Sequence, residues 1–310
     1  MQEKTRGMIE MTGAMTVSGT IGVFVVLSGQ SFTDVVFWRC VFGALTLLAV
    51  CAALGFLRRD VMTKRQFALA VLGGVFLVVN WLLLFAAFPR TSISIATTVY
   101  NTQPFMLVVL GALLLGEKPT VAKVGWLVVA FIGLLLIVAA KNDTTIGTDY
   151  LGGILLALGA AFFYAAVAIV AKQLKGVPPH LIALIQVTVG IVMLAPFAGD
   201  GGFATDMHGF LCLVTIGVVH TGLLYIVLYG AMQRLPTHLI GALSFVYPIV
   251  AILADYVVLD RHLQPLQLVG GAIILFAAAA TATDARFSFL FRSQRGAAIA
   301  AASCASQRQN

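Results

Sequence analysis

A short polar stretch interrupts an apolar run near residue 100. Residues 99–106 read VYNTQPFM and lie inside the run 93–115, which is otherwise apolar. Hydrocarbon offers no hydrogen-bond partner to polar groups, so this stretch is favourable only where it faces the interior of a helical bundle. Pro104 removes a backbone hydrogen bond about one turn earlier, which loosens the helix around Tyr100 and Asn101. We predict a hinge at Pro104 and substrate contacts from Tyr100 and Asn101.

A second proline and several polar or aromatic residues complete a predicted cavity. Tyr247 and Pro248 repeat the device in the run 237–259, so Pro248 is predicted as a second hinge. Aromatic walls with neutral hydrogen-bonding groups are typical of a small-molecule site. Prolines and Trp81 can also serve packing alone, and threonines can hydrogen-bond their own helix. The predicted substrate-binding residues are Thr16, Thr20, Asn80, Trp81, Tyr100, Asn101, Tyr164, Tyr225, Tyr229, Ser244 and Tyr247.

Charged or protonatable side chains lie well inside three of the apolar runs. Arg39 and Asp255 are each within about two turns of a predicted outer helix end, and His220 lies deeper. Charges within membrane helices are functional candidates, so we predict a role in ion coupling or an ion pair for these residues. The alternatives are snorkelling to the surface, or pairing of Arg39 with Asp34 or with Asp255. His220 can carry a proton or stay neutral in the core.

The composition and the long apolar runs that hold these residues indicate membrane helices. Hydrophobic residues make up 60% of the 310 residues and charged residues 10%, whereas soluble domains contain about 25% charged residues. Runs of about 17 to 25 apolar residues are long enough to span a bilayer. We predict an all-α integral membrane protein. Its ten spans are 8–28, 34–57, 66–88, 93–115, 120–140, 150–172, 180–198, 209–231, 237–259 and 264–283.

The basic residues are distributed unequally between the two sides of these spans. With the N-terminus inside, 15 of the 19 lysines and arginines fall on the inner side; the others are Arg39, Arg90, Lys141 and Arg261. Such a bias marks the cytoplasmic side, so we predict a bacterial inner-membrane protein with both termini in the cytoplasm. The bias also explains the net charge of +7 without a nucleic-acid partner. The predicted partners are a small-molecule substrate and the lipid bilayer, for a monomer or a homodimer.

The chain contains an internal repeat. A shift of 144 residues aligns Arg90 with Arg234 and Pro104 with Pro248. Each half holds five helices, an odd number, so the halves insert in opposite orientations. Inverted repeats are a common plan of secondary transporters, with substrate bound between the halves. The predicted parts are a first repeat at 8–140, a second repeat at 150–283 and a basic cytoplasmic tail at 284–310.

The chain resembles the EamA branch of the drug/metabolite transporter superfamily. The resemblance rests on the duplication, on FWRCVFGALTLL from residue 37, and on QPFMLVVLGALLLGEKPTVAKVGWLVVAFIGLLLIV from residue 103. The second repeat departs from it, with DRHLQ at 260–264 where a Gly-Glu pair is usual. Members of this family export amino acids and other metabolites, and some import vitamins or related compounds. The resemblance therefore implies transport and leaves its direction open.

We predict a secondary transporter that exports a small polar or amphipathic, amino acid-like metabolite by alternating access. No metal or cofactor is predicted, since the four cysteines lack metal-binding spacing. The stretch GALLLGEK has Glu117 where a phosphate loop needs lysine. Uptake of a vitamin-like or nucleobase-like compound is the alternative. An intramembrane enzyme, using His220 and Ser244, and a membrane scaffold are alternatives of other classes.

Overall fold

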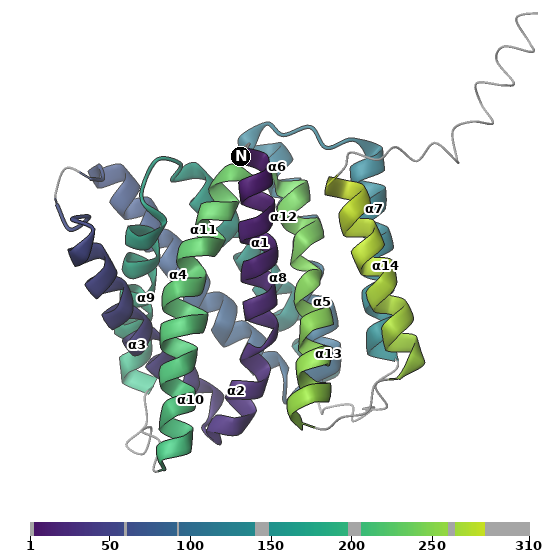
Figure 1. The fold of residues 1–310 in the computed structure, drawn as a ribbon, viewed down its shortest axis with the longest axis horizontal. Helices are drawn as coiled ribbons and strands as arrows, with labels where there is room; N and C mark the ends of the chain where they lie inside the picture. Colours follow the sequence, from purple (N-terminus) through teal and green to yellow (C-terminus); the bar gives the residue numbers. More distant parts are fainter. Residues whose placement is uncertain are drawn as a thin grey trace, which may run out of the picture.

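The architecture is that of a helical membrane bundle (Figure 1). A computed structural model describes residues 3–58, 61–91, 93–139, 149–197, 206–259 and 264–282. Within these ranges every regular element is a helix. Nine helical segments there are apolar and long enough to cross a bilayer, and a tenth, shorter apolar helix covers Pro265–Thr281. The predicted all-α membrane fold is confirmed.

The helix bounds follow the predicted spans within a few residues, except at the start of the chain. The first helix begins at Glu3 rather than at residue 8, because Glu3 and Glu10 have partners in the bundle, described below. The elements are α1 (Glu3–Gly19), α2 (Ile21–Ser28), α3 (Phe32–Ala53), α4 (Lys64–Ala87), α5 (Ile93–Tyr100), α6 (Gln103–Leu115), α7 (Val121–Ala139), α8 (Tyr150–Gln173), α9 (Pro179–Leu194), η1 (Ala195–Phe197), α10 (Met207–Gly217), η2 (Val218–Leu223), α11 (Leu224–Arg234), α12 (Thr237–Ser244), α13 (Val246–Leu259) and α14 (Pro265–Ala282).

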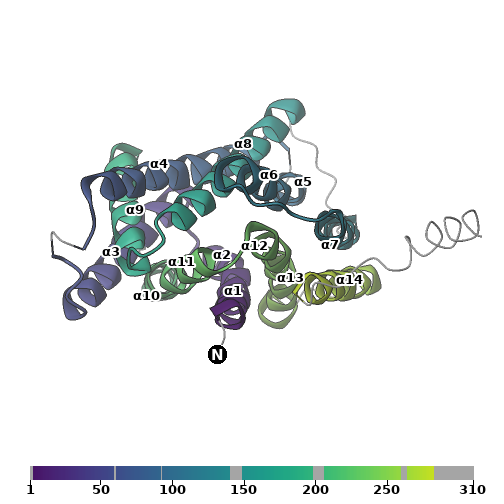
Figure 2. The same ribbon diagram turned by 90° about the horizontal axis from the view of Figure 1, so that it is seen from above.

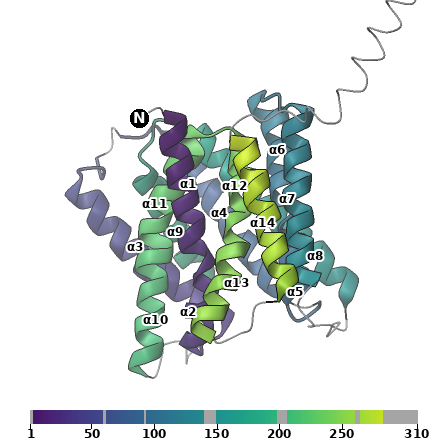
Figure 3. The same ribbon diagram turned by 45° about the vertical axis from the view of Figure 1, so that its right-hand side comes forward.

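Two spans are interrupted just before a proline. Asn101 and Thr102 separate α5 from α6, and Phe245 separates α12 from α13 (Figure 3). Pro104 and Pro248 follow these interruptions, and each lacks the N–H that would bond a carbonyl one turn earlier. Asn101 and Phe245 are 144 residues apart, as the repeat predicts. The loosening predicted before Pro104 is observed as an interruption, and it recurs before Pro248, whereas the action of both prolines as hinges stays a prediction.

Two further irregularities are not predicted by the sequence pattern. Thr20 separates α1 from α2, and η2 is a π-helix between α10 and α11. A π segment inserts an extra residue into an α-helix and redirects the side chains along it, and such segments are frequent at functional sites. His220 and Thr221 lie in this π segment.

Equivalent helices of the two repeats pack against each other. The contacts are α3 with α9, α7 with α14, and α6 with α12, the last two being parts of the equivalent spans 93–115 and 237–259. These contacts follow one another along the length of the molecule (Figure 2). The contact between α4 of the first repeat and α8 of the second corresponds to that between α11 of the second repeat and α1 of the first. This arrangement is expected of two repeats related by an approximate two-fold axis.

Glycines allow two of these helix contacts to be close. A Cβ atom on Gly133 of α7 would lie 2.7 Å from the Gly270 carbonyl oxygen of α14. A Cβ atom on Gly43 of α3 would lie 2.7 Å from Cγ2 of Thr221. Small residues permit such approaches between membrane helices. The second contact brings Arg39, one turn before Gly43, beside the π segment.

Candidate functional site

Aromatic rings from several helices gather inside the bundle. The rings of Tyr100 (α5) and Tyr164 (α8) meet edge to face at 6.0 Å, and those of Tyr225 and Tyr229 (α11) at 5.2 Å. Tyr225 and Tyr247 also lie near Tyr100. The structure therefore brings together the five tyrosines singled out from the sequence, which we call the tyrosine cluster. Their contact with substrate stays a prediction.

Two buried amides border the tyrosine cluster and have unused polar atoms. Nδ2 of Asn80 donates to the Ala160 carbonyl oxygen at 2.6 Å and to the Tyr100 hydroxyl at 3.4 Å, whereas its Oδ1 has no protein partner. Oε1 of Gln186 accepts a hydrogen bond from the Tyr229 hydroxyl, and its Nε2 has no protein partner. Buried polar groups without partners are unfavourable, so these two atoms fit contacts to a ligand or to water.

Gln186 was not among the predicted residues. The sequence does mark Gln186 as a candidate, since it is a lone amide in the middle of the apolar run 180–198. Its position on α9, facing Gly73 and Gly74 of α4, became evident only from the helix packing. A Cβ atom on Gly74 would lie 3.0 Å from Cα of Gln186. Because Gly73 and Gly74 have no side chains, α9 can approach α4 closely and the Gln186 amide still fits between the two helices.

Arg39 lies inside the bundle rather than at its surface. Its side chain is 7% exposed. Nε donates to Oγ1 of Thr221 at 3.0 Å, and Cζ lies 4.6 Å from the ring centroid of Trp81, a cation–π contact. Asp34 instead accepts a hydrogen bond from Ser31 at 2.6 Å. The alternatives of snorkelling and of pairing with Asp34 are therefore wrong, because the π segment and Trp81 provide an internal position for the guanidinium.

His220 has a partner for each ring nitrogen. Nε2 lies 2.9 Å from Oγ1 of Thr20, and Nδ1 lies 3.5 Å from the Thr215 carbonyl oxygen. The ring also contacts Phe24, with centroids 5.2 Å apart. This environment fits the alternative of a neutral histidine held in the core. Thr20 is thus brought to the π segment rather than to the tyrosine cluster.

Three of the predicted substrate-binding residues bond a carbonyl of their own helix. Thr16 lies on the exposed face of α1 and bonds the Thr12 carbonyl oxygen at 2.9 Å. Asn101 and Ser244 are buried, but each bonds a carbonyl of its own helix at 2.7 Å. These geometries match the alternative that such side chains satisfy their own helix. The side chain of Asp255 lies outside the part of the chain that the structure describes, so its pairing with Arg39 stays a prediction.

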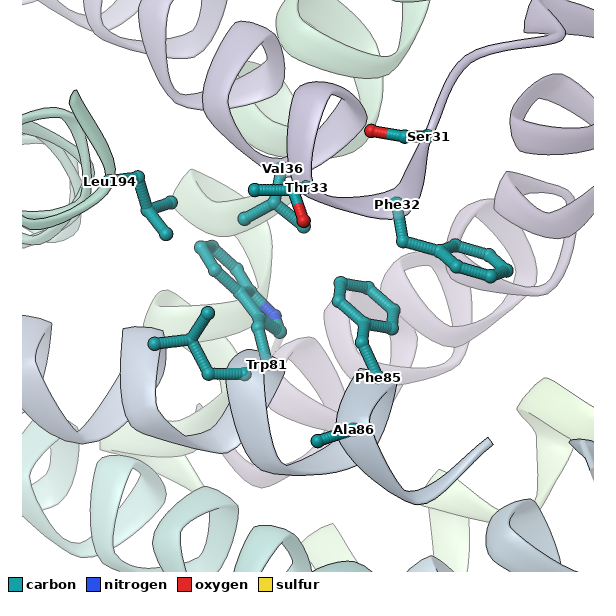
Figure 4. Close-up of a pocket in the computed structure, with 9 residues that line it drawn as sticks. Ser31, Phe32, Thr33, Val36, Trp81, Phe85, Ala86 and Leu194 are labelled. Carbon is teal, nitrogen blue, oxygen red and sulfur yellow. The ribbon is translucent and has the colours of Figure 1, made fainter. Parts of the chain in front are cut away.

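A pocket of about 420 Å³ opens between the start of α3 and the end of α4 (Figure 4). We call the end of the bundle at which α1 begins the N-terminal end, and the other end the opposite end. The pocket lies at the opposite end. Phe32 and Phe85 stack at one side of the pocket, with centroids 5.2 Å apart. Trp81 is the predicted substrate residue that lines it. The lining residues are Ser31, Phe32, Thr33, Val36, Trp81, Leu82, Phe85, Ala86 and Leu194.

The N-terminal end is held by polar contacts between the repeats. Oε2 of Glu117 accepts from the Thr237 backbone N–H at 2.8 Å and from its hydroxyl at 2.7 Å, and Oε1 pairs with Lys172 Nζ at 3.1 Å. We call Glu117, Lys172 and Thr237 the Glu117 latch. Burial alone would raise the pKa of the Glu117 carboxyl, but the Thr237 hydrogen bonds and the Lys172 ammonium outweigh it and lower the pKa. The carboxylate therefore stays ionised at neutral pH.

A glycine aims Glu117 at the second repeat. Gly116 ends α6 with a φ of 66°, in the left-handed region that favours glycine. The N–H of Glu117 then bonds the Gly111 carbonyl oxygen at 3.1 Å. A Cβ atom on Gly111 would lie 2.7 Å from Oγ1 of Thr237, so α6 approaches Thr237 closely. In the Gly-Glu pair of the first repeat, the glycine thus ends α6 and the glutamate contacts the second repeat.

Equivalent arginines make unequal ion pairs at the two ends. Arg234 pairs with Glu10 at 2.8 Å, and these side chains are 24% and 19% exposed. Arg90, its equivalent by the repeat, lies 3.5 Å from Asp149, and these side chains are 43% and 60% exposed. Exposed pairs contribute little because water screens them. Among the described residues, the Arg234 pair at the N-terminal end is therefore the closer and less exposed of the two.

The fold and this interior define a class of protein, a multi-pass membrane transporter built from two repeats. A model of the EamA-like transporter family matches residues 5–139 and 151–283. The chain belongs to this family. It is a transporter and not an enzyme.

Similar proteins agree with this assignment. The chain is 32% identical to the uncharacterized transporter YxxF of Bacillus subtilis, over 83% of each chain. It is 25% identical to a probable amino-acid metabolite efflux pump of Salmonella typhimurium, over 58% of this chain and 64% of that protein. A crystal structure with 18% sequence identity matches with a TM-score of 0.79 over 91% of this chain and 97% of the other. This last likeness concerns the fold alone.

Proposed function

We propose that the protein is a secondary transporter that exports a small polar or amphipathic, amino acid-like metabolite by alternating access. The efflux pump among its relatives supports the direction and the substrate class. In this proposal the two repeats, 8–140 and 150–283, rock against each other in the bacterial inner membrane. Both termini and the tail 284–310 lie in the cytoplasm. A gradient of substrate or of an ion drives the movement.

The unequal closure of the two ends carries this proposal. Arg90 and Arg234 are equivalent in the repeat, yet only Arg234 makes a close and half-buried ion pair. The Glu117 latch adds closure at the same end as Arg234. An inverted-repeat transporter exchanges the environments of its two ends during transport. In this proposal the arrangement is the state closed at the N-terminal end.

Outward flux from proteoliposomes tests the proposal. Liposomes containing the purified protein are loaded with labelled amino acids, nucleobases or flavins, and the release of each compound is compared with that from empty liposomes. We expect saturable release of at least one amino acid. Release no faster than from empty liposomes for every compound of the panel would contradict the proposal.

Two variants separate the tyrosine cluster from the rest of the bundle. Asn80→Leu removes an amide whose Oδ1 has no protein partner, so we expect flux to fall about tenfold, the effect of one lost hydrogen bond to substrate. Thr16→Val is the matched control, since Thr16 is exposed and bonds its own helix. Equal loss of flux in both variants, at equal protein yield, would argue against a substrate site beside Asn80.

A further inference from the structure

Arg39 is a buried cation without a carboxylate partner among the side chains that the structure describes. Its contacts are the Thr221 hydroxyl, the face of Trp81 and the nearby Tyr225 hydroxyl. The acidic side chains within the described residues have other partners. These partners are Arg234 for Glu3, Arg6 and Arg234 for Glu10, Ser31 for Asp34, Lys172 for Glu117, Arg90 for Asp149 and the Gly209 N–H for Asp206.

The free part of the Arg39 guanidinium suits an anion. A guanidinium carries five N–H donors in a planar fork that matches a carboxylate in a bidentate contact. Thr221 uses the Nε donor, the Tyr225 hydroxyl accepts from one further N–H, and Trp81 covers a face of the group rather than its donor edge. A buried charge without a counter-charge is unfavourable, because the interior does not replace its hydration. An anion bound at the remaining terminal N–H donors would remove this penalty.

The neighbouring pocket suits an apolar group. Val36, which lies one turn before Arg39 in α3, lines the pocket, and so does the Trp81 ring that contacts Arg39 (Figure 4). Phe32 and Phe85 add two further aromatic rings. A volume of about 420 Å³ lies at the small end of the range for ligand pockets. A cation and an aromatic pocket thus share Trp81 as a common wall.

We propose that Arg39 binds the carboxylate of an amphipathic organic acid whose apolar part occupies the pocket formed by Phe32, Trp81 and Phe85. This proposal rests on the proposed function and names the group of the substrate that is recognised. The carboxylate is the required group, and an ammonium group is not. Monocarboxylates with an aromatic or branched apolar part are therefore the preferred ligands.

A ligand series on the wild-type protein tests this proposal. Tritiated 3-phenylpropionate is bound to purified protein in detergent, and unlabelled 3-phenylpropionate, 3-phenylpropanamide and 3-phenylpropylamine compete with it. The three compounds share the ring and differ in charge. We expect the acid to compete at least about tenfold better than the amide or the amine, the effect of one charge-assisted contact.

Variants of Arg39 assign the preference to this residue. Arg39→Lys should retain a preference for the acid, whereas Arg39→Gln should bind acid and amide equally. Arg90→Gln is the matched control, because Arg90 is an exposed arginine at the same end of the bundle, and it should behave as wild type. The wild-type series gives a result even if Arg39→Gln does not fold.

Three results would overturn the proposal. They are equal competition by acid and amide on wild-type protein, an undiminished preference in folded Arg39→Gln, and no saturable binding of 3-phenylpropionate at millimolar concentration. The flux assay with the amino acid panel is separate from this one. Flux without any carboxylate preference would reject the role of Arg39 and leave the transporter function in place. Absence of all flux, with acid-selective binding, would reject transport instead.

Discussion

Replacing Glu117 with glutamine should open the N-terminal end of the bundle. The carboxylate accepts two hydrogen bonds from Thr237, at 2.8 and 2.7 Å, and pairs with Lys172 at 3.1 Å. Glutamine keeps the size of the side chain and one acceptor oxygen, but it removes the charge. All of these contacts join the first repeat to the second, so their loss should favour the state in which this end is open.

The expected size follows from the number and burial of these contacts. A hydrogen bond to a charged group contributes about 1.5 to 3 kcal/mol, and a half-buried ion pair on the order of 1 kcal/mol. Glutamine retains part of this, so we expect a loss of about 2 kcal/mol, or roughly a 30-fold shift in the equilibrium between closed and open states. If about 99 of 100 wild-type molecules are closed at this end, roughly three in four Glu117→Gln molecules would be closed.

Spin labels across the latch measure this shift. Lys118 and Lys175 are exposed and lie next to the latch in different repeats, so each is replaced by a labelled cysteine. Cys40, Cys51 and Cys212 are buried and can remain, and Cys304 is replaced by serine. Pulsed electron resonance then gives the distance distribution between the labels. We expect a longer-distance component in Glu117→Gln.

A control variant makes the result specific to the latch. Glu3→Gln also removes a carboxylate that pairs across repeats, but this side chain is 75% exposed, so its effect should be small. If Glu117→Gln has the wild-type distance distribution, or changes it no more than Glu3→Gln does, then the latch does not hold the end closed.

Three further predictions concern the pH dependence of the latch, the close contact at Gly43 and the topology of the chain. The pKa of Glu117 is lowered from 4.5 in the folded protein, so the stabilisation by the latch is complete above pH 4.5 and is lost as the pH falls through the lower folded value. In wild type the distance between the spin labels should therefore lengthen in acid. A distance that does not change in acid would contradict this prediction. Gly43→Ala should lower the thermal unfolding midpoint of the purified protein, because the added Cβ forces α3 away from Thr221. Gly13→Ala is the control and should leave the midpoint unchanged, since no atom lies within 4 Å of its Cβ position. Equal midpoints for the two variants would refute the close contact at Gly43. Reporter tags at both termini should prove cytoplasmic, and a periplasmic C-terminus would rule out ten spans.

The sequence by itself determined the membrane spans and the two interruptions before prolines. Length and apolarity of a run are local properties, and a bilayer demands internally bonded backbone, so the spans could be predicted from composition along the chain. Pro104 and Pro248 act through their own missing N–H groups, so the interruptions at Asn101 and Phe245 were predictable too. The repeat register followed from the shared spacing of these features.

Only the tertiary structure decided which polar residues lie together. Thr16 and Thr20 share a helix face in the sequence pattern, yet Thr16 is exposed and Thr20 contacts His220, because α1 is interrupted and η2 is a π-helix. Arg39 has the sequence position of a shallow charge, but the close contact at Gly43 holds it against Thr221. Burial of a side chain depends on the neighbouring helices, which helical periodicity within one run does not specify.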